Sequence, residues 1–261
     1  MTIQNFENNR AFTHGEAVKV HFFRRNGELI LAEDTYFHLM SSMRRMRMEI
    51  PMNYTLEYFT FMLNSLGNTA QNGIHQLMVF PIMENGKKVI THHEHFLAVK
   101  DICDIQKTVV LDIQKEITVN THFLSNIRTY SPENCYAQVY AVENDLDDVI
   151  LLNPNKKIAR TIHGNLLLLK GEELRVVKPS EGAYLSPLME SFITHLHKKK
   201  LATITEAEIA PFETQQAEEI LLISDELGIM SVNKIRAKSF ENNRFTDLLE
   251  DWKQSFGNDK V

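Results

Sequence analysis

The chain has 261 residues, of which 43% are hydrophobic and 24% are charged, so it is long enough for one large domain or two ordinary ones with apolar cores. Its formal net charge of −6 argues against general nucleic-acid binding, which needs a basic surface. No apolar run approaches a membrane span and the polar residues 2–10 do not resemble a signal peptide, so we expect a cytoplasmic protein with no membrane partner. Two cysteines, Cys103 and Cys135, are too few for a disulfide framework and are expected to be buried thiols.

The first hundred residues predict an antiparallel sheet with helices on one side. Val18–Phe23 alternates as a strand does, Asn26-Gly27 is a strong hairpin turn, and Glu28–Leu31 returns. Asp34 is then the expected N-cap of a helix that places Tyr36, Leu39, Met40, Met43 and Met46 on one face. The remaining elements are a helix over roughly Thr55–Ser65 that Gly67 ends, with Tyr58, Phe59 and Phe61 in the core, and strands at His75–Ile82 and Val89–Val99.

The run Thr91–His95 contains three histidines and a glutamate, which are zinc ligands. In a strand, however, His93 and His95 face one side while His92 and Glu94 face the other. Neither face holds more than two ligands, so we expect no metal site.

The second half begins after the polar stretch Asp101–Lys107, and we therefore expect two domains, residues 1–104 and 105–261. Ser131 and Pro132 predict a helix start, and so do Ser186 and Pro187. The expected strands are Thr108–Ile113, Val149–Leu152, Asn165–Leu169, Val176–Pro179, Ala202–Ile209, Glu219–Ser224 and Ser231–Ile235, and a closing helix covers Phe245–Phe256.

The stretch Leu124–Leu169 resembles the core of the fold-type IV pyridoxal-phosphate (PLP) enzymes, which include branched-chain and D-amino-acid aminotransferases and aminodeoxychorismate lyase. There it runs roughly L-S-N-x-K-T, N-Y-L, a helix, A-L-L-L-N, a turn and V-x-E-G-T-S-S-N-I-F. The matching residues are Leu124, Ser125, Asn126, Thr129, Leu151, Leu152, Asn153 and Asn165. The resemblance implies a two-domain, D-amino-acid aminotransferase-like fold of mixed α+β and α/β type, and a homodimer in which a second subunit completes the pocket.

The same resemblance implies where PLP would bind, and this chain differs at each of five contacts. The substitutions are Arg128 at the Schiff-base lysine, Arg160 at the pyridine-nitrogen glutamate, His38 at the phosphate-binding arginine, Leu188 at one phosphate-binding threonine, and Asp225 and Glu226 at the turn of the other. An arginine stays protonated and cannot form the imine. Arg160 would repel the proton on the ring nitrogen, and two carboxylates would repel a phosphate. We therefore expect no bound PLP and no aminotransferase activity.

Three functions remain open, and so does the question of whether the protein is an enzyme. The first is a class IV aminotransferase or aminodeoxychorismate lyase homologue, a pseudoenzyme candidate that binds a small anionic metabolite. Arg128 and Arg160 would face one cleft between the domains, with His38, Thr129 and Asn165 as further ligand-binding candidates. The second is an active PLP enzyme with a non-standard site. The third is a dimeric scaffold whose pocket is vestigial, with Asp225, Glu226 or another acid neutralising the arginines.

Overall fold

The computed structural model describes residues 6–66 and 70–258. The chain forms two compact units, Met1–Val99 with Ile127–Tyr130, and Lys100–Asn126 with Ser131–Val261. The predicted domains, residues 1–104 and 105–261, stay a prediction. No helix in the described part of the chain is long and apolar enough to cross a membrane.

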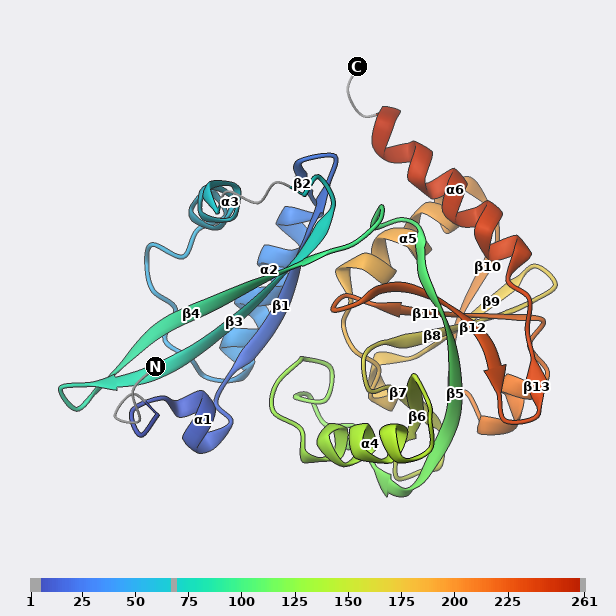
Figure 1. The fold of residues 1–261 in the computed structure, drawn as a ribbon, viewed down its shortest axis with the longest axis horizontal. Helices are drawn as coiled ribbons and strands as arrows, with labels where there is room; N and C mark the ends of the chain where they lie inside the picture. The colour runs from blue at the N-terminus through green and yellow to red at the C-terminus, as the bar shows by residue number, and fades with distance from the viewer. Residues whose placement is uncertain (1–5, 67–69, 259–261) are drawn as a thin grey trace. The chain divides into compact units, whose positions relative to one another are not determined.

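The first unit contains a four-stranded antiparallel sheet in the order β2-β1-β3-β4 (Figure 1). Its strands are β1 (Val18–Arg25), β2 (Glu28–Ile30), β3 (Gly73–Glu84) and β4 (Lys87–Ala98). The predicted turn at Asn26-Gly27 is confirmed, and both residues have positive φ, as a two-residue hairpin loop requires.

The helices of this unit are α1 (Arg10–His14), α2 (Ala32–Arg45) and α3 (Leu56–Ser65). The helix predicted over roughly Thr55–Ser65 is confirmed as α3, and Thr55 caps it, since its hydroxyl accepts the N–H of Tyr58 at 3.2 Å. The prediction for α2 is wrong: Asp34 lies inside the first turn, and Leu31, in the left-handed conformation, stands at the N-cap without a side-chain hydrogen bond. Phe61 was expected in the core but is 76% exposed. Gly67, the predicted end of α3, lies outside the described residues.

One face of this sheet and the two longer helices share an apolar core. Val18, Val20 and Phe22 of β1 alternate into it, as the strand period requires. On β4, His92 and Glu94 face the same side as predicted: His92 Nδ1 lies 2.9 Å from the Tyr54 hydroxyl, and Glu94 Oε1 lies 2.6 Å from His75 Nδ1. Among the described residues, no group of three or more histidines, cysteines and acids could hold a metal ion.

The second unit is built on a nine-stranded sheet in the order β10-β9-β8-β11-β12-β5-β6-β7, with β13 paired to β12. Its long strand β5 (Ile105–Thr118) runs parallel to both of its neighbours. The other strands are β6 (Asp148–Leu152), β7 (Ile158–Thr161), β8 (Asn165–Lys170), β9 (Glu173–Val177), β10 (Thr203–Ala207), β11 (Glu219–Ser224), β12 (Gly228–Ile235) and β13 (Lys238–Ser239).

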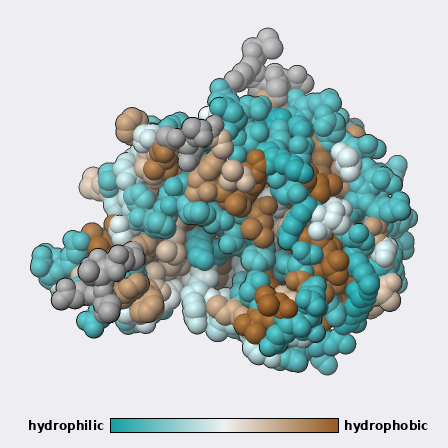
Figure 2. Space-filling model, in the orientation of Figure 1, coloured by the Kyte–Doolittle hydropathy of each residue, from teal (hydrophilic) through white to brown (hydrophobic). Residues whose placement is uncertain are grey.

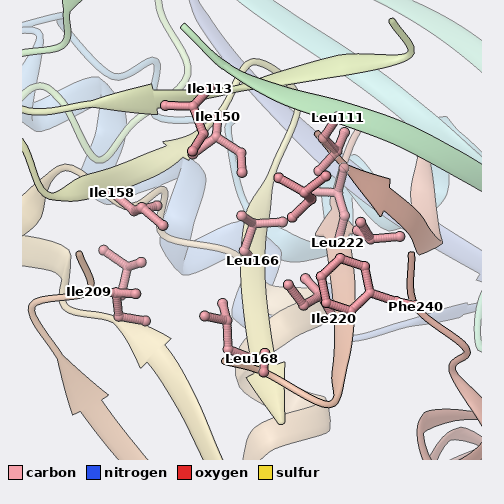
Figure 3. Close-up of a cluster of buried hydrophobic side chains, with 14 of the residues drawn as sticks. Leu111, Ile113, Ile150, Ile158, Leu166, Leu168, Ile209, Ile220, Leu222 and Phe240 are labelled. Carbon is pink, nitrogen blue, oxygen red and sulfur yellow. The ribbon is translucent and has the colours of Figure 1, made fainter. Parts of the chain in front are cut away.

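The helices in the described part of this unit are α4 (Pro132–Glu143), α5 (Pro187–Lys199) and α6 (Asn243–Asn258), and the 3-10 helices are η2 (Pro179–Glu181) and η3 (Pro211–Gln215). Figure 3 shows aliphatic side chains from several strands, among them Leu111, Ile150 and Leu166, meeting in the main core. Phe192 of α5 and Trp252 of α6 join those helices, with ring centroids 5.4 Å apart.

Two predicted helix caps fix the starts of α4 and α5. The hydroxyl of Ser131 accepts the N–H of Asn134 at 3.2 Å, and that of Ser186 accepts the N–H of Met189 at 3.1 Å. Both helices carry proline in the first turn, so both predictions are confirmed. Cys103 is buried as expected, but Cys135 is exposed on α4. Figure 2 shows a mostly hydrophilic surface on the face that it draws, with scattered apolar residues.

Candidate functional site

Arg160 is a buried guanidinium in the second unit, with only 4% of the residue exposed. It belongs to β7 and pairs with Leu151 of β6. Its Nη1 donates to the carbonyl oxygen of Gly182 at 3.0 Å, and Nη2 donates to Asn134 Oδ1 at 3.4 Å. The guanidinium carbon lies 4.4 Å from the centre of the Tyr184 ring, a cation–π contact.

All of these partners of Arg160 are neutral. No described carboxylate forms an ion pair with the Arg160 guanidinium. The buried Nε of Arg160 has no hydrogen-bond partner among the described residues. A buried charge without a counter-ion is costly, and so is a buried N–H without an acceptor. Such an orphaned donor calls for an explanation, for which a bound ion or water is the usual candidate.

The partners of Arg160 come from a tightly held segment, Gly182–Ser186. The side chain of Asn165 accepts the N–H of Tyr184 at 2.9 Å and donates to its carbonyl oxygen at 2.8 Å. Gly182 has φ of +100°, and a Cβ there would lie 3.2 Å from Asn120 O and from Ala159 Cβ. The amide of Asn165 thus fixes the backbone of Tyr184, and its predicted role in ligand binding stays a prediction.

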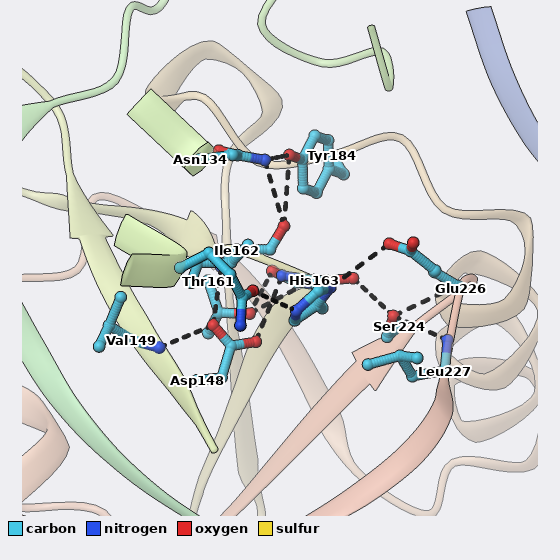
Figure 4. Close-up of polar contacts among 12 residues, drawn as sticks. Asn134, Asp148, Val149, Thr161, Ile162, His163, Tyr184, Ser224, Glu226 and Leu227 are labelled. Atoms are coloured by element: carbon cyan, nitrogen blue, oxygen red, sulfur yellow. Dashed lines mark hydrogen bonds and ion pairs between the residues drawn. The ribbon is translucent and has the colours of Figure 1, made fainter. Parts of the chain in front are cut away.

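The turn after Arg160 is held by the buried carboxylate of Asp148 (Figure 4). Asp148 Oδ1 accepts the N–H of Ile162 at 2.9 Å, and Oδ2 accepts that of His163 at 3.2 Å. Burial raises the pKa of Asp148, and the charge of His163, the Thr161 hydroxyl and the N–H groups of Ile162 and Val149 oppose that rise. The carbonyl oxygen of Ile162 in turn accepts the Tyr184 hydroxyl at 3.5 Å. Asp148 therefore fixes the residue to which Tyr184, a neighbour of Arg160, is hydrogen-bonded.

Asp225 and Glu226 occupy the turn between β11 and β12. The hydroxyl of Ser186 donates to Asp225 Oδ1 at 2.5 Å, and Asp225 is 4% exposed. Glu226 Oε2 lies 3.4 Å from Nδ1 of His163 (Figure 4). Leu188, in the first turn of α5, is fully buried and has no polar atom to offer a ligand.

The first unit brings Arg128 and His38 together. Arg128 is buried, and its carbonyl oxygen accepts the N–H of Lys19 at 2.9 Å in an antiparallel bridge. Burial lowers the pKa of His38 to about 4, and the charges of Arg128 and Arg45 add to the effect. The imidazole is therefore neutral at physiological pH. Thr129 follows Arg128 and is half-buried.

The candidate residues thus fall into two groups, Arg128, Thr129 and His38 in the first unit, and Arg160, Asn165, Leu188, Asp225 and Glu226 in the second. The convergence of Arg128 and Arg160 on one cleft stays a prediction. Sequence reasoning missed Asn134, Tyr184 and His163 as neighbours of the candidate residues. Of these three residues, only Asn134 had a signal in the sequence. The predicted cap at Ser131 places Asn134 in the first turn of α4.

The sequence matches the model of the amino-transferase class IV family over residues 23–235. No curated protein sequence matches the chain. Among solved structures, a candidate 4-amino-4-deoxychorismate lyase from Legionella pneumophila is similar, with a TM-score of 0.81 and 18% identity over 100% of this chain and 97% of that one. The branched-chain aminotransferase from Thermoproteus uzoniensis gives a TM-score of 0.83 and 14% identity over 97% of this chain and 89% of its own. These likenesses show the D-amino-acid aminotransferase-like fold of fold-type IV, mixed α/β with two sheets, as the sequence predicts.

Proposed function

We propose that this chain, which belongs to the class IV aminotransferase family, binds a small anionic metabolite at Arg160 without the family's PLP chemistry. The observation that carries the proposal is the Arg160 guanidinium, which is buried among neutral partners and keeps one orphaned donor. An anion supplies both the missing charge and the missing acceptor.

The arrangement of donors on Arg160 favours a carboxylate. A carboxylate binds a guanidinium through two parallel hydrogen bonds, and Nε with Nη2 is one edge that supplies both. Nη1 is already engaged by Gly182 at 3.0 Å, whereas Nη2 makes only a long contact of 3.4 Å and Nε makes none among the described residues. The edge whose donors are least satisfied is therefore the bidentate one.

The residues at the cofactor positions do not fit PLP. Arg128, which stands at the Schiff-base lysine by resemblance, offers a guanidinium that cannot form an imine. Arg160 would bring a positive charge to a ring nitrogen that must itself stay protonated. The buried carboxylate of Asp225 would meet the phosphate. Each mismatch costs about 1–3 kcal/mol of binding free energy.

The direct test of anion binding is calorimetric titration of the purified protein with benzoate. Wild-type protein should bind it, and Arg160→Met, which keeps the unbranched aliphatic part of the side chain but removes the guanidinium and its charge, should not. Arg236→Met serves as the matched control, because the Arg236 guanidinium pairs with Asp112 on the surface. Equal binding by wild type and Arg160→Met would refute the proposal.

The test of the cofactor prediction is addition of PLP, absorbance spectroscopy, borohydride reduction and mass spectrometry. We expect no imine absorbance and no adduct. Arg128→Lys alone should not restore binding, because Arg160 and Asp225 still oppose the cofactor, whereas Arg128→Lys with Arg160→Glu should restore weak binding. A PLP adduct on a lysine of the unmutated protein would favour the second candidate function, an active enzyme with a non-standard site. Absence of both anion and PLP binding would favour the third, a dimeric scaffold.

A further inference from the structure

A buried hydrogen-bond chain in the first unit joins Arg24 of β1, His75 of β3 and Glu94 of β4. His75 is fully buried, and its Nδ1 lies 2.6 Å from Glu94 Oε1. Its other ring nitrogen, Nε2, accepts the Nε–H of Arg24 at 3.2 Å. The Phe96 ring packs against the imidazole, with the ring centroids 4.7 Å apart. Because Nε2 must carry no proton to accept from Arg24, the single proton of the neutral ring lies on Nδ1 and is donated to Glu94.

The remaining donors of Arg24 hold two segments that are distant from His75 in the sequence. Nη1 donates to the carbonyl oxygen of Gly27, in the turn between β1 and β2, at 2.9 Å. Nη2 donates to the carbonyl oxygen of Leu63 at 3.1 Å and to Asn64 Oδ1 at 3.0 Å, both in the last turn of α3. A basic side chain that binds a carbonyl there stabilises the helix end. Arg24 therefore connects this turn and the end of α3 to His75.

Protonation of His75 removes the acceptor that Arg24 uses. The second proton can be added only to Nε2, because Nδ1 already carries one. Two N–H donors then face each other across the 3.2 Å between Nε and Nε2, and both side chains are positively charged. Burial lowers the pKa of His75 and the charge of Arg24 adds to the effect, whereas Glu94 opposes it. The imidazole is therefore neutral at physiological pH and takes up its proton in acid.

We propose that His75 is a pH-sensitive switch: uptake of a proton at Nε2 breaks its hydrogen bond with Arg24 and releases the last turn of α3 and the turn between β1 and β2. The proton comes from solvent. Glu94 holds the imidazolium through Nδ1–H, so Arg24 is the side chain that moves. The inference does not depend on the proposed anion site, because Arg160 belongs to the other unit.

The experiment is an NMR titration of the isotope-labelled full chain from pH 7.5 down to the onset of unfolding. The ring nitrogens of His75, assigned by their absence in His75→Gln, should show the Nδ1–H tautomer at pH 7.5 and proton uptake at Nε2 in acid. The backbone amides of Gly27 and Asn64 should change chemical shift with the same midpoint. In His75→Gln, which keeps an acceptor for Arg24 but takes up no proton, at least two thirds of that change should be lost.

The matched control is His92→Gln, which removes another histidine of the same sheet, one that contacts the Tyr54 hydroxyl rather than Arg24. Here the amides of Gly27 and Asn64 should keep the wild-type midpoint. Loss of their response in His92→Gln, or an unchanged response in His75→Gln, would overturn the assignment to His75. So would protonation of His75 without a change at these amides, or a His75 ring that stays neutral until the first unit unfolds.

Glu94→Gln provides a second variant if His75→Gln does not fold, as judged by circular dichroism. It removes the charge that favours the imidazolium, so the midpoints of the His75 ring and of both amides should move together to lower pH. Unchanged midpoints, or a ring and amides that no longer titrate together, would refute the switch.

Discussion

The half-buried histidine His38 of the first unit makes the pH dependence of stability predictable. Burial on α2 lowers the pKa of His38 to about 4, with Arg128 and Arg45 adding to the effect. The unfolded chain, in which the pKa returns to about 6.5, binds a proton that the folded protein does not. The free energy of unfolding therefore falls as the pH falls through this window, and replacing His38 with asparagine removes that contribution.

The size of the effect follows from the two pKa values. Each unit corresponds to about 1.4 kcal/mol, and between pH 7.5 and pH 4.5 the part due to His38 comes to about 2.5 kcal/mol. Urea unfolding at both pH values measures it directly. Wild-type protein should lose about 2.5 kcal/mol more than His38→Asn over this interval.

A matched pair of arginine variants tests the cause. Arg45→Gln should raise the pKa of His38 in an NMR titration, because its charge disfavours the imidazolium. Arg44→Gln, an exposed neighbour on the same helix, should leave it unchanged. Parallel pH curves for wild type and His38→Asn, or titration of His38 near 6.5 in the folded protein, would refute the reasoning.

Three further predictions concern stability and assembly. Arg160→Met should leave the free energy of unfolding without ligand unchanged or raise it by about 1–3 kcal/mol, because the variant removes an uncompensated buried charge; a loss above about 3 kcal/mol in urea would contradict this. Gly164→Ala should lower the free energy of unfolding by at least about 2 kcal/mol in thermal unfolding, since the new Cβ would lie 2.2 Å from the carbonyl oxygen of Ile223. The control is Gly86→Ala, whose Cβ would meet nothing within 4 Å and which should cost only the ~1 kcal/mol of its positive φ. Sedimentation at micromolar concentration should give a homodimer, and a species of 30.2 kDa, the mass of one chain, would count against it.

The features that the sequence predicts best are those that depend only on residues close together in the chain, such as helix caps. Ser131 and Ser186 cap their helices as expected, because a cap involves only the next three residues. Strand ends were harder to place: β5 extends from Ile105 to Thr118, well beyond the apolar residues Thr108–Ile113, because pairing with both neighbours holds its polar ends.

In the candidate site, too, local features could be predicted and long-range contacts could not. Resemblance located Arg160 and Asp225, but their contacts depend on register and on turns that are distant in the sequence. Asn134 comes from α4 and Tyr184 from the segment before α5, and both meet Arg160 only after the sheet has formed. No local pattern indicates which acceptor a buried guanidinium will find, so this part of the site could not be predicted.

The position of β5 also has a consequence for synthesis of the chain. Its first residue, Ile105, pairs with Ile229 of β12, a partner about 120 residues later in the sequence. A ribosome adding residues one by one exposes β5 long before that partner exists, and an unpaired strand edge invites association with other chains. Closing so long a loop is also slow, because its entropy must be lost before the new contacts form. Folding of this unit should therefore be slow, and newly made chains should benefit from a chaperone that shields β5 until β12 has been synthesised.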